Sequence, residues 1–349
     1  MSRVPGKKYR NPRRHLYPMI YIVNKSTDPA YNISLEEYCF KRLKQFDKIF
    51  ILWINEPAII VGRYQNTLAE INERYVKERG IHVVRRITGG GAVYHDLENL
   101  NYTIISNEEE GRSDFDFETF SQPVIEALAG LGVKAEFSGR NDITIDGKKI
   151  CGNAQAYADE RVMHHGCLLF NTDLTVLSKA LEPSKETIGS KGVKSVRSRV
   201  DNILPHLKEE ITVHEFADKI LEEMISRFPE MKPYQFSDNE LQEIEQSRRE
   251  KFGNWEWNYG SNPPAEVVRE SRYPAGKIEV FLDLKHGKID RIRFFGTFFG
   301  RNGDLAEVET RLKGIKYTPE AVKKALLEIG TSRYFTGFTL EELTEAIAG

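Results

Sequence analysis

The chain has 349 residues, 40% of them hydrophobic and 29% charged, which is typical of a globular protein and long enough for two domains. Its net charge of −2 argues against a fold built around nucleic acid, and no apolar run approaches the roughly 20 residues that cross a bilayer. The three cysteines are odd in number and far apart, which argues against a disulfide framework or a structural zinc site and favours a reducing cytoplasm.

The first part of the chain predicts short strands and helices in an irregular order. After a basic N-terminal tail, Ser34 and Glu37 have the spacing of a helix-capping box, and apolar runs at 49–54 and 58–62 predict two neighbouring strands. The other elements predicted here are helices at 66–80, 117–131 and 212–228 and strands at 81–86, 101–106 and 162–171. Thr212 and Glu215 form the predicted capping box of the third helix. Because strands and helices do not alternate regularly, we expect an α+β fold with a mixed or antiparallel sheet.

The last third of the chain predicts a different set of elements. A polar helix predicted at 238–251 is followed by a β-hairpin that turns at His286-Gly287. Helices are then predicted to begin at Asp304, Thr318 and Thr339. We therefore divide the chain into a tail (1–18), a large domain (19–235), a linker helix (236–252) and a small α/β domain (253–349).

Residues 85–96, with the sequence RRITGGGAVYHD, form the densest candidate motif. Consecutive glycines at the end of a strand let the backbone approach a ligand and turn its N–H groups toward anionic oxygens. An arginine at the mouth of such a loop can bind a phosphate or a carboxylate through two parallel hydrogen bonds. A plain glycine turn is the alternative, and the two arginines before the glycines favour anion binding over it.

Two lysines follow the predicted Asp146-Gly147 turn between strands. Lys148 and Lys149 would lie on opposite faces of a strand, so only one of them can point into a site. Cys151 would then share the face of Lys149. Two solvated lysine side chains are the alternative interpretation.

The segment 185–199 carries a third candidate motif, rich in lysine, arginine, glycine and serine. It has no apolar helical stripe, so it predicts either a mobile basic loop suited to closing over a polyphosphate or a solvated surface loop. The sequence contains no P-loop and no set of kinase motifs. Spacing alone therefore predicts an anionic, nucleotide-like ligand.

Four blocks of the sequence resemble, in order, those of the lipoate–protein ligase A family: RRITGGGAVYHD, GRNDITIDGKKICGNAQ, HHGCLLFNTDL and KGVKSVRSRVDNI. The resemblance covers nearly the whole chain after the tail. It implies a large catalytic domain with a mixed β-sheet of the biotin/lipoate ligase type, and a small α/β C-terminal accessory domain.

The resemblance also implies an ATP-dependent lipoate–protein ligase that salvages lipoate. Lipoate would react with ATP, with Mg²⁺ as activator, to give lipoyl-AMP and pyrophosphate. The lipoyl group would then pass to the ε-amine of an acceptor lysine, and AMP would leave. The implied acceptors are lipoyl domains of 2-oxoacid dehydrogenase E2 subunits and the glycine-cleavage H protein. No permanently bound cofactor, membrane or nucleic acid is expected.

The resemblance assigns roles to individual residues. Lys149 is the implied catalytic residue, bridging the lipoyl carbonyl and the α-phosphate, and Asp142 is the candidate for holding the metal. The implied ATP- and adenylate-binding residues are Arg86, Gly91, Ala92, Val93, Tyr94, Lys149, Lys191, Gly192, Val193, Lys194, Ser195, Val196, Arg197 and Ser198. The implied lipoate-binding residues are Trp53, Arg86, Thr88, His95, Lys149 and His165.

Two residues depart from the family pattern and keep alternatives open. Glu98 stands where glycine is expected, which could alter the loop backbone, and Cys151 stands where serine is common. A cysteine beside Lys149 admits an octanoyl or lipoyl acyltransferase that uses a thioester, although a buried, inert cysteine is preferred. A non-catalytic lipoate carrier is the second alternative. A biotin ligase that also binds DNA is disfavoured, because no helix-turn-helix segment precedes the catalytic part.

Overall fold

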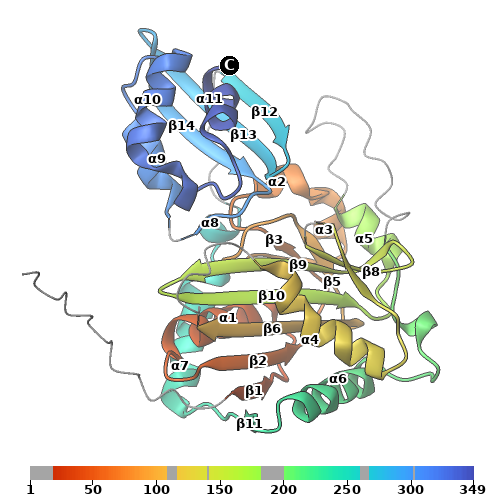
Figure 1. The fold of residues 1–349 in the computed structure, drawn as a ribbon. Helices are drawn as coiled ribbons and strands as arrows, with labels where there is room; N and C mark the ends of the chain where they lie inside the picture. The colour runs from red at the N-terminus through yellow and green to blue at the C-terminus, as the bar shows by residue number, and fades with distance from the viewer. Residues whose placement is uncertain (1–18, 108–115, 140, 182–199, 260–266, 302) are drawn as a thin grey trace, which may run out of the picture.

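The computed structural model describes residues 19–107, 116–139, 141–181, 200–259, 267–301 and 303–349 (Figure 1). Within these ranges the chain forms one eight-stranded sheet and two three-stranded sheets. The C-terminal sheet and its helices form a separate unit above the rest of the molecule in Figure 1. This α+β architecture, with a large mixed sheet and a small C-terminal unit, confirms the predicted fold class.

The eight-stranded sheet is mixed, with order β11-β1-β2-β6-β10-β9-β8-β7. The pairs β1–β11 and β1–β2 are parallel, and the other strand pairs of this sheet are antiparallel. Its strands are β1 (Ile20–Val23), β2 (Lys48–Trp53), β6 (Asn99–Asn107), β7 (Glu136–Ser138), β8 (Asp142–Ile145), β9 (Lys148–Ala158), β10 (Arg161–Leu169) and β11 (Lys232–Pro233).

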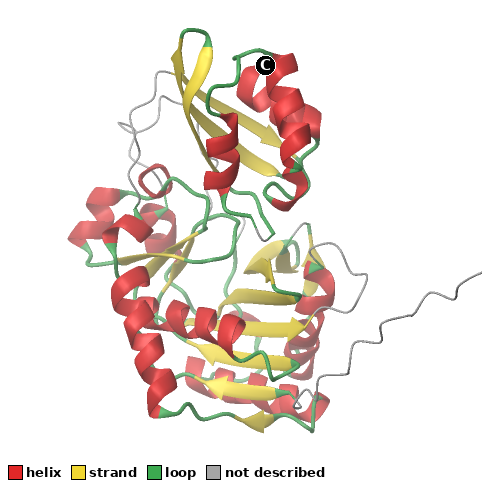
Figure 2. Cartoon of the chain, turned by 90° about the vertical axis from the view of Figure 1, so that its left-hand side faces the viewer, coloured by secondary structure: helices red, strands yellow, loops and turns green. Residues whose placement is uncertain are grey.

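Helices cover both faces of this sheet (Figures 1 and 2). Helices α4 (Phe117–Gly130) and α6 (Val213–Arg227) pack on one face, and α1 (Pro29–Arg42) and α7 (Asp238–Ser247) cover the other. Successive residues of β2 therefore alternate between two hydrophobic clusters, with Phe50 on the α4–α6 side and Ile51 on the α1 side. The capping box predicted for α6 at Thr212 is confirmed.

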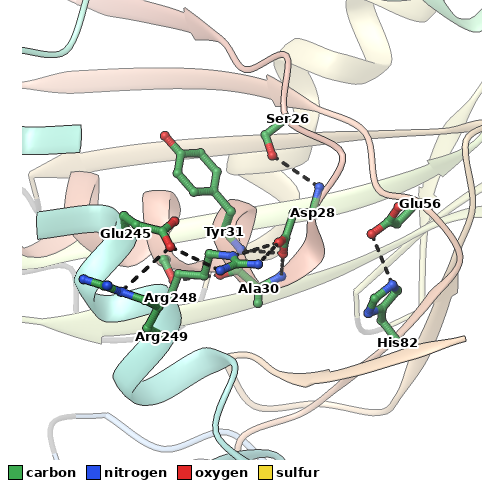
Figure 3. Close-up of polar contacts among 10 residues, drawn as sticks. Ser26, Asp28, Ala30, Tyr31, Glu56, His82, Glu245, Arg248 and Arg249 are labelled. Carbon is green, nitrogen blue, oxygen red and sulfur yellow. Dashed lines mark hydrogen bonds and ion pairs between the residues drawn. The ribbon is translucent and has the colours of Figure 1, made fainter. Parts of the chain in front are cut away.

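Helix α1 begins earlier than the sequence pattern predicted. Asp28 is its N-cap and accepts hydrogen bonds from the backbone N–H groups of Ala30 (2.8 Å) and Tyr31 (3.0 Å). The predicted capping box at Ser34 is wrong, because Ser34 lies inside the helix and donates to the Ala30 carbonyl. Asp28 also binds Arg248 of the π-helical turn η3 (Arg248–Phe252), which fastens the end of the linker helix to α1 (Figure 3).

A second, three-stranded sheet has the order β4-β3-β5. It contains β3 (Ala58–Val61), β4 (His82–Arg85) and β5 (Val93–His95). The strands predicted at 49–54 and 58–62 are therefore not neighbours, since β2 and β3 belong to different sheets. His82 on β4 contacts Glu56 in the β2–β3 connection at 3.1 Å (Figure 3).

The helix predicted at 66–80 is replaced by two short helices, α2 (Thr67–Glu70) and α3 (Glu73–Glu78). The break comes where the Asn72 side chain caps α3 by accepting from the Tyr75 N–H at 3.1 Å. The remaining short elements of this part are α5 (Leu174–Ala180), α8 (Trp255–Asn258) and the 3₁₀ turn η2 (Leu204–His206).

The C-terminal unit has its own hydrophobic core between a sheet and a helical layer. The predicted hairpin is present, with φ of 51° at His286 and 71° at Gly287. Its partner β12 escaped prediction because its sequence, VVRESRY, is mostly polar and charged after the first two valines and shows no apolar alternation. The elements are β12 (Val267–Tyr273), β13 (Gly276–Lys285), β14 (Lys288–Gly296), α9 (Leu305–Leu312), α10 (Pro319–Ile329), η4 (Thr331–Arg333) and α11 (Leu340–Ala348).

The C-terminal unit rests directly on the glycine-rich loop. The Gly90 N–H donates to the Phe298 carbonyl at 3.4 Å, and a Cβ atom at Gly89 would lie only 2.2 Å from that same oxygen. The Tyr64 and Phe298 rings stack with their centroids 4.9 Å apart. The domain boundaries at 235 and 252 remain predictions.

Candidate active site

A narrow cavity lies between the large sheet and the glycine-rich loop, with about 540 Å³ of space free of protein atoms. Its floor is built from two rows of side chains on one face of the sheet, because directly paired residues of neighbouring strands project to the same side. One row is Trp53, Asn101, Cys167 and Gly152, and the next is His165 and Ala154, with Thr103 beside His165 outside the lining. Ile33, Ile60 and residues 91–93 also line the cavity.

Arg86 holds the glycine-rich loop in shape. Its guanidinium donates to the carbonyl oxygens of Ile60 (2.9 Å), Gly89 (2.7 Å) and Gly91 (2.8 Å), and to the Thr88 hydroxyl (2.8 Å). Burial lowers the pKa of Arg86 to about 10, so it stays charged at neutral pH. The loop needs glycine at Gly90, where φ is +89°. Arg86 thus lines the cavity, and its hydrogen bonds go to the loop itself.

Arg85 has a purely internal set of partners. Its guanidinium donates to the backbone carbonyls of Gly62, Arg63, Gln65, Trp257 and Asn258 and to the Thr67 hydroxyl. It therefore ties β4 to the segment that leads into the C-terminal unit. Both arginines of the pair that favoured anion binding in the sequence therefore use most of their hydrogen bonds on the protein backbone.

Lys149 is the lysine that points inward. Lys148 extends to Asp201 at 3.2 Å on the surface, whereas the Lys149 ammonium lies over Gly152 and 2.8 Å from Asp142. A Cβ at position 152 would come within 2.7 Å of the Lys149 Nζ atom, so glycine makes room for the ammonium.

The prediction that Cys151 shares the face of Lys149 is wrong. Strand β9 has a bulge, since Lys149 pairs with Thr144 while Cys151 pairs with the adjacent Ile143. The extra residue, Ile150, shifts the alternation, and Cys151 turns into the hydrophobic core on the far side of the sheet. Burial raises the pKa of its thiol well above the usual value, so Cys151 is not a ready thiolate.

A wider cavity, with about 1300 Å³ of space free of protein atoms, adjoins the narrow one. The two cavities share Ala92, Val93, Lys149, Gly152 and Cys167. The wider cavity also reaches Tyr94, Asp142 and the glycine turns at 139 and 147. Lys149 therefore lies where the two spaces meet.

A buried chain of hydrogen bonds runs beneath the narrow cavity, and its proton positions follow from the groups that can only donate. Trp53 Nε1 donates to Thr103 Oγ1 (3.0 Å), so the Thr103 hydroxyl donates to Glu36. From the other end, Arg86 Nε donates to Thr88 Oγ1, which lies 2.8 Å from His165 Nε2. The Thr88 hydroxyl donates to this nitrogen when the ring is neutral with its proton on Nδ1.

His165 Nδ1 then donates to Glu36 Oε1 at 2.9 Å. Both ends of the chain thus converge on one carboxylate oxygen of Glu36. Glu36 was missed by sequence reasoning because it lies on α1, far along the chain from every motif, and only the fold brings it under the site.

His95 offers an N–H group to the same cavity. The Asn32 amide donates to Asn55 Oδ1 (2.8 Å), so the Asn55 amide must donate to His95 Nδ1 at 3.0 Å. The proton of the neutral ring therefore sits on Nε2, which is buried and has no hydrogen-bond partner among the described residues. Burial, together with the charge of Arg86 and the neighbouring His165, lowers the pKa of His95 to about 3.

The structure brings most predicted site residues together. The narrow cavity is lined by Trp53, Arg86, Gly91, Ala92, Val93, His95, Lys149 and His165, while Tyr94 and Asp142 line the wider one. Thr88 contacts His165 and Arg86 beneath the loop. Residues 191–198, predicted to bind the adenylate, lie outside the described residues. Lining residues that the motifs did not single out include Ile33, Ile60, Asn101, Asn153 and Cys167.

Glu98 does not force the loop into an unusual backbone. It is not among the residues with positive φ, and its N–H donates to the Asp96 side chain at 3.0 Å. Cys167 is the thiol that faces the cavities, and burial raises its pKa to about 12. At neutral pH it is therefore a neutral thiol.

The described residues contain no cluster of three or more acidic, histidine or cysteine side chains that could hold a metal ion. Asp142 is a single carboxylate beside the wider cavity. This arrangement fits a magnesium ion carried mainly by nucleotide phosphates, which commonly needs only one or two protein carboxylates. It does not fit an ion held by the protein alone. None of the helices in the described ranges combines the length and apolar character needed to cross a bilayer.

Comparison with known proteins identifies close relatives of the chain. Residues 28–225 match the model of the lipoyl protein ligase A/B catalytic domain, and residues 262–347 match that of the bacterial lipoate protein ligase C-terminus. The chain is 42% identical over 335 residues to lipoate-protein ligase LplJ of Bacillus subtilis (strain 168), covering 94% of this chain and 100% of that protein.

Two solved structures share the fold. P. falciparum LipL1 in complex with lipoate has a TM-score of 0.74 at 24% identity, covering 89% of this chain and 94% of the other. A lipoate-protein ligase A bound with ATP has a TM-score of 0.58 at 24% identity, covering 70% and 99%. At this level of identity the two structures support the fold alone.

Proposed function

The chain belongs to the lipoate–protein ligase family, and on this premise we propose that it activates lipoate with ATP to lipoyl-AMP and transfers the lipoyl group to a lysine of an acceptor protein. The observation that carries the proposal is the position of Lys149 at the junction of two cavities. The narrow cavity, walled by Trp53, Ile33 and Ile60, suits the chain and ring of lipoate. The wider cavity suits the nucleotide.

In the first step, a lipoate carboxylate oxygen attacks the α-phosphorus of ATP, and the bond to the β-phosphate breaks to release pyrophosphate. Two anions must approach each other, and positive charge at the point of contact lowers that barrier. Lys149 supplies this charge at the junction, and Arg86 keeps the loop carbonyls turned away from the ligand. We assign the adenylate to the space beside Ala92, Val93 and Tyr94.

In the second step, the neutral amine of the acceptor lysine attacks the lipoyl carbonyl carbon. An amide forms, the carbonyl–phosphate bond breaks, AMP leaves and the amine loses a proton. Lys149 stabilises the charge that develops on the carbonyl oxygen. No nucleophile of the protein is required in either step.

Magnesium would enter with the nucleotide and neutralise phosphate charge. Asp142 would contribute a carboxylate from the wider cavity. Its present partner is Lys149 at 2.8 Å, so the carboxylate lies within reach of the same phosphates that the lysine would contact. Residues 191–198 are assigned to the adenylate by the family resemblance alone.

Acceptor lysines of this family's substrates lie on lipoyl domains. We propose the lipoyl domains of 2-oxoacid dehydrogenase E2 subunits and the glycine-cleavage H protein as acceptors, and the cytoplasm as the site of reaction.

An acyltransferase that works through a cysteine thioester is the alternative. The burial of Cys151 and its raised thiol pKa argue against it. The protein should be incubated with lipoate, MgATP and an apo H protein, and lipoylation followed by intact mass together with pyrophosphate release. We expect ATP-dependent lipoylation that survives in Cys151→Ser.

Acyl transfer from a lipoylated or octanoylated carrier without ATP, abolished in Cys151→Ser, would overturn the proposal. Binding of lipoate without pyrophosphate release would make the protein a carrier.

A further inference from the structure

Asn101 is buried in the floor of the narrow cavity with its amide unused. The residue has 0% of its surface exposed and lines the cavity. Neither its Oδ1 nor its Nδ2 atom has a hydrogen-bond partner among the described residues. Leaving a buried polar group unpaired is energetically costly. An amide in this position therefore indicates a ligand that presents a polar or polarisable group to it.

A second unpaired donor faces the same cavity. The Nε2–H group of His95 is buried and without a partner in the described ranges, and its proton position is fixed through Asn55. The His95 ring lies against Trp53, with centroids 5.9 Å apart, and Trp53 pairs directly with Asn101 across β2 and β6. Two donors thus flank the Trp53 end of the cavity.

This end lies far from the reacting carboxylate. Asn101, Cys167 and Gly152 are successive members of one cross-strand row, and the Lys149 ammonium lies over Gly152. Two strand spacings of about 4.8 Å place the backbone of Asn101 roughly 10 Å from that of Gly152. A lipoate whose carboxylate meets Lys149 would bring its dithiolane ring, rather than its carboxylate, to Asn101.

We propose that the Asn101 amide, assisted by His95, donates hydrogen bonds to the sulfur atoms of the dithiolane ring, and that Asn101 makes the enzyme prefer lipoate over sulfur-free acids. The proposal rests on the proposed function, since it concerns the same site and reaction. A hydrocarbon chain or ring without sulfur would fill the same space but leave the amide unpaired. A site with a buried polar group rejects an analogue that lacks the matching group more strongly than an apolar site does.

The test is a competition between two acids for one acceptor. Lipoate is mixed in equal concentration with 5-cyclopentylpentanoate, in which methylene groups replace both ring sulfurs, and the two acylated products of an apo lipoyl domain are counted by intact mass. Their ratio reports relative kcat/KM and does not depend on how much enzyme is folded. Octanoate replaces the cyclopentyl acid in a second arm, which separates the effect of the ring from that of sulfur.

Asn101→Leu is expected to lower the lipoate preference over the cyclopentyl acid by at least about fivefold, and Asn101→Ser, which keeps a donor, by less. Ile33→Val is the matched control, because it trims an apolar wall of the same cavity and should affect both acids alike. If Asn101→Leu does not fold, the ratio of the two acylated products is measured with Asn101→Ala, which also removes the amide.

An unchanged ratio in the Asn101 variants would overturn this inference while leaving the ligase intact. A ratio that changes with octanoate but not with the cyclopentyl acid would also overturn it, because the residue would then recognise shape. If the wild-type protein acylates nothing from free acid and ATP, the proposed function fails.

Discussion

Replacing Arg86 by lysine is expected to destabilise the protein even before any ligand binds. The guanidinium satisfies three carbonyl oxygens that belong to Ile60, Gly89 and Gly91, and Arg86, Ile60 and Gly89 are buried. A lysine ammonium is a single point of charge on a flexible stem and cannot replace the fork that reaches all three. If two carbonyls lose their partners, the cost is about 2–4 kcal/mol. For a domain of this size, that corresponds to a fall in Tm on the order of 10 °C.

Thermal unfolding of the ligand-free protein, followed by circular dichroism, measures this effect. Arg74→Lys is the matched control, because Arg74 is exposed and its ion-pair partner among the described residues is Glu78, one turn away, so the Tm of this variant should not change. A normal Tm for Arg86→Lys together with lost ligation would refute the reasoning. Arg86 would then act on the ligand and not on the loop.

Three further outcomes follow from the same geometry. Gly152→Ala should keep its circular dichroism spectrum yet lose ligation by at least about tenfold in the intact-mass assay, because the added Cβ displaces the Lys149 ammonium. Native protein at pH 8 should take up no iodoacetamide by mass, and three labels after denaturation, because all three cysteines are buried and the pKa of each thiol is raised. The folded-state pKa of His95, about 3, lies below its unfolded value of about 6.5, so its neutral form stabilises the fold and stability falls as pH drops below 6.5. This costs about 2 kcal/mol by pH 5, and the fall in Tm from pH 7 to 5 should be smaller in His95→Asn. Prompt alkylation of the native protein would contradict the expectation for the cysteines. An equal fall in Tm in the wild-type protein and in His95→Asn would contradict the expectation for His95.

Local sequence patterns predicted those features of the molecule that depend on local chemistry. The Asp146-Gly147 turn, the capping box at Thr212 and the hairpin at His286-Gly287 are all present where the residues predicted them. Lys149 could be singled out from Lys148 only as one of two possibilities, because alternation along a strand does not say which face is covered. The fold class followed from the irregular order of elements.

Features that depend on distant partners could not be predicted in this way. The bulge in β9, which turns Cys151 away from Lys149, is set by its pairing with β8 and leaves no mark in the sequence pattern. Glu36 and Asn101 contribute to the site only because α1 and β6 are brought beneath the glycine-rich loop. Arg85 and Arg86 look alike in sequence, and only their partners reveal that both are used to hold the backbone.

Lys149 is proposed to serve both half-reactions from the junction of the two cavities. The most direct measurement compares wild-type protein with Lys149→Met in two separate assays: lipoate-dependent exchange of pyrophosphate into ATP, and transfer to an apo lipoyl domain from supplied lipoyl-AMP. We expect both rates to fall by at least about a hundredfold in a variant that remains folded. A Lys149→Met protein that transfers from lipoyl-AMP at the wild-type rate would contradict this expectation, because the lysine would then act in activation alone.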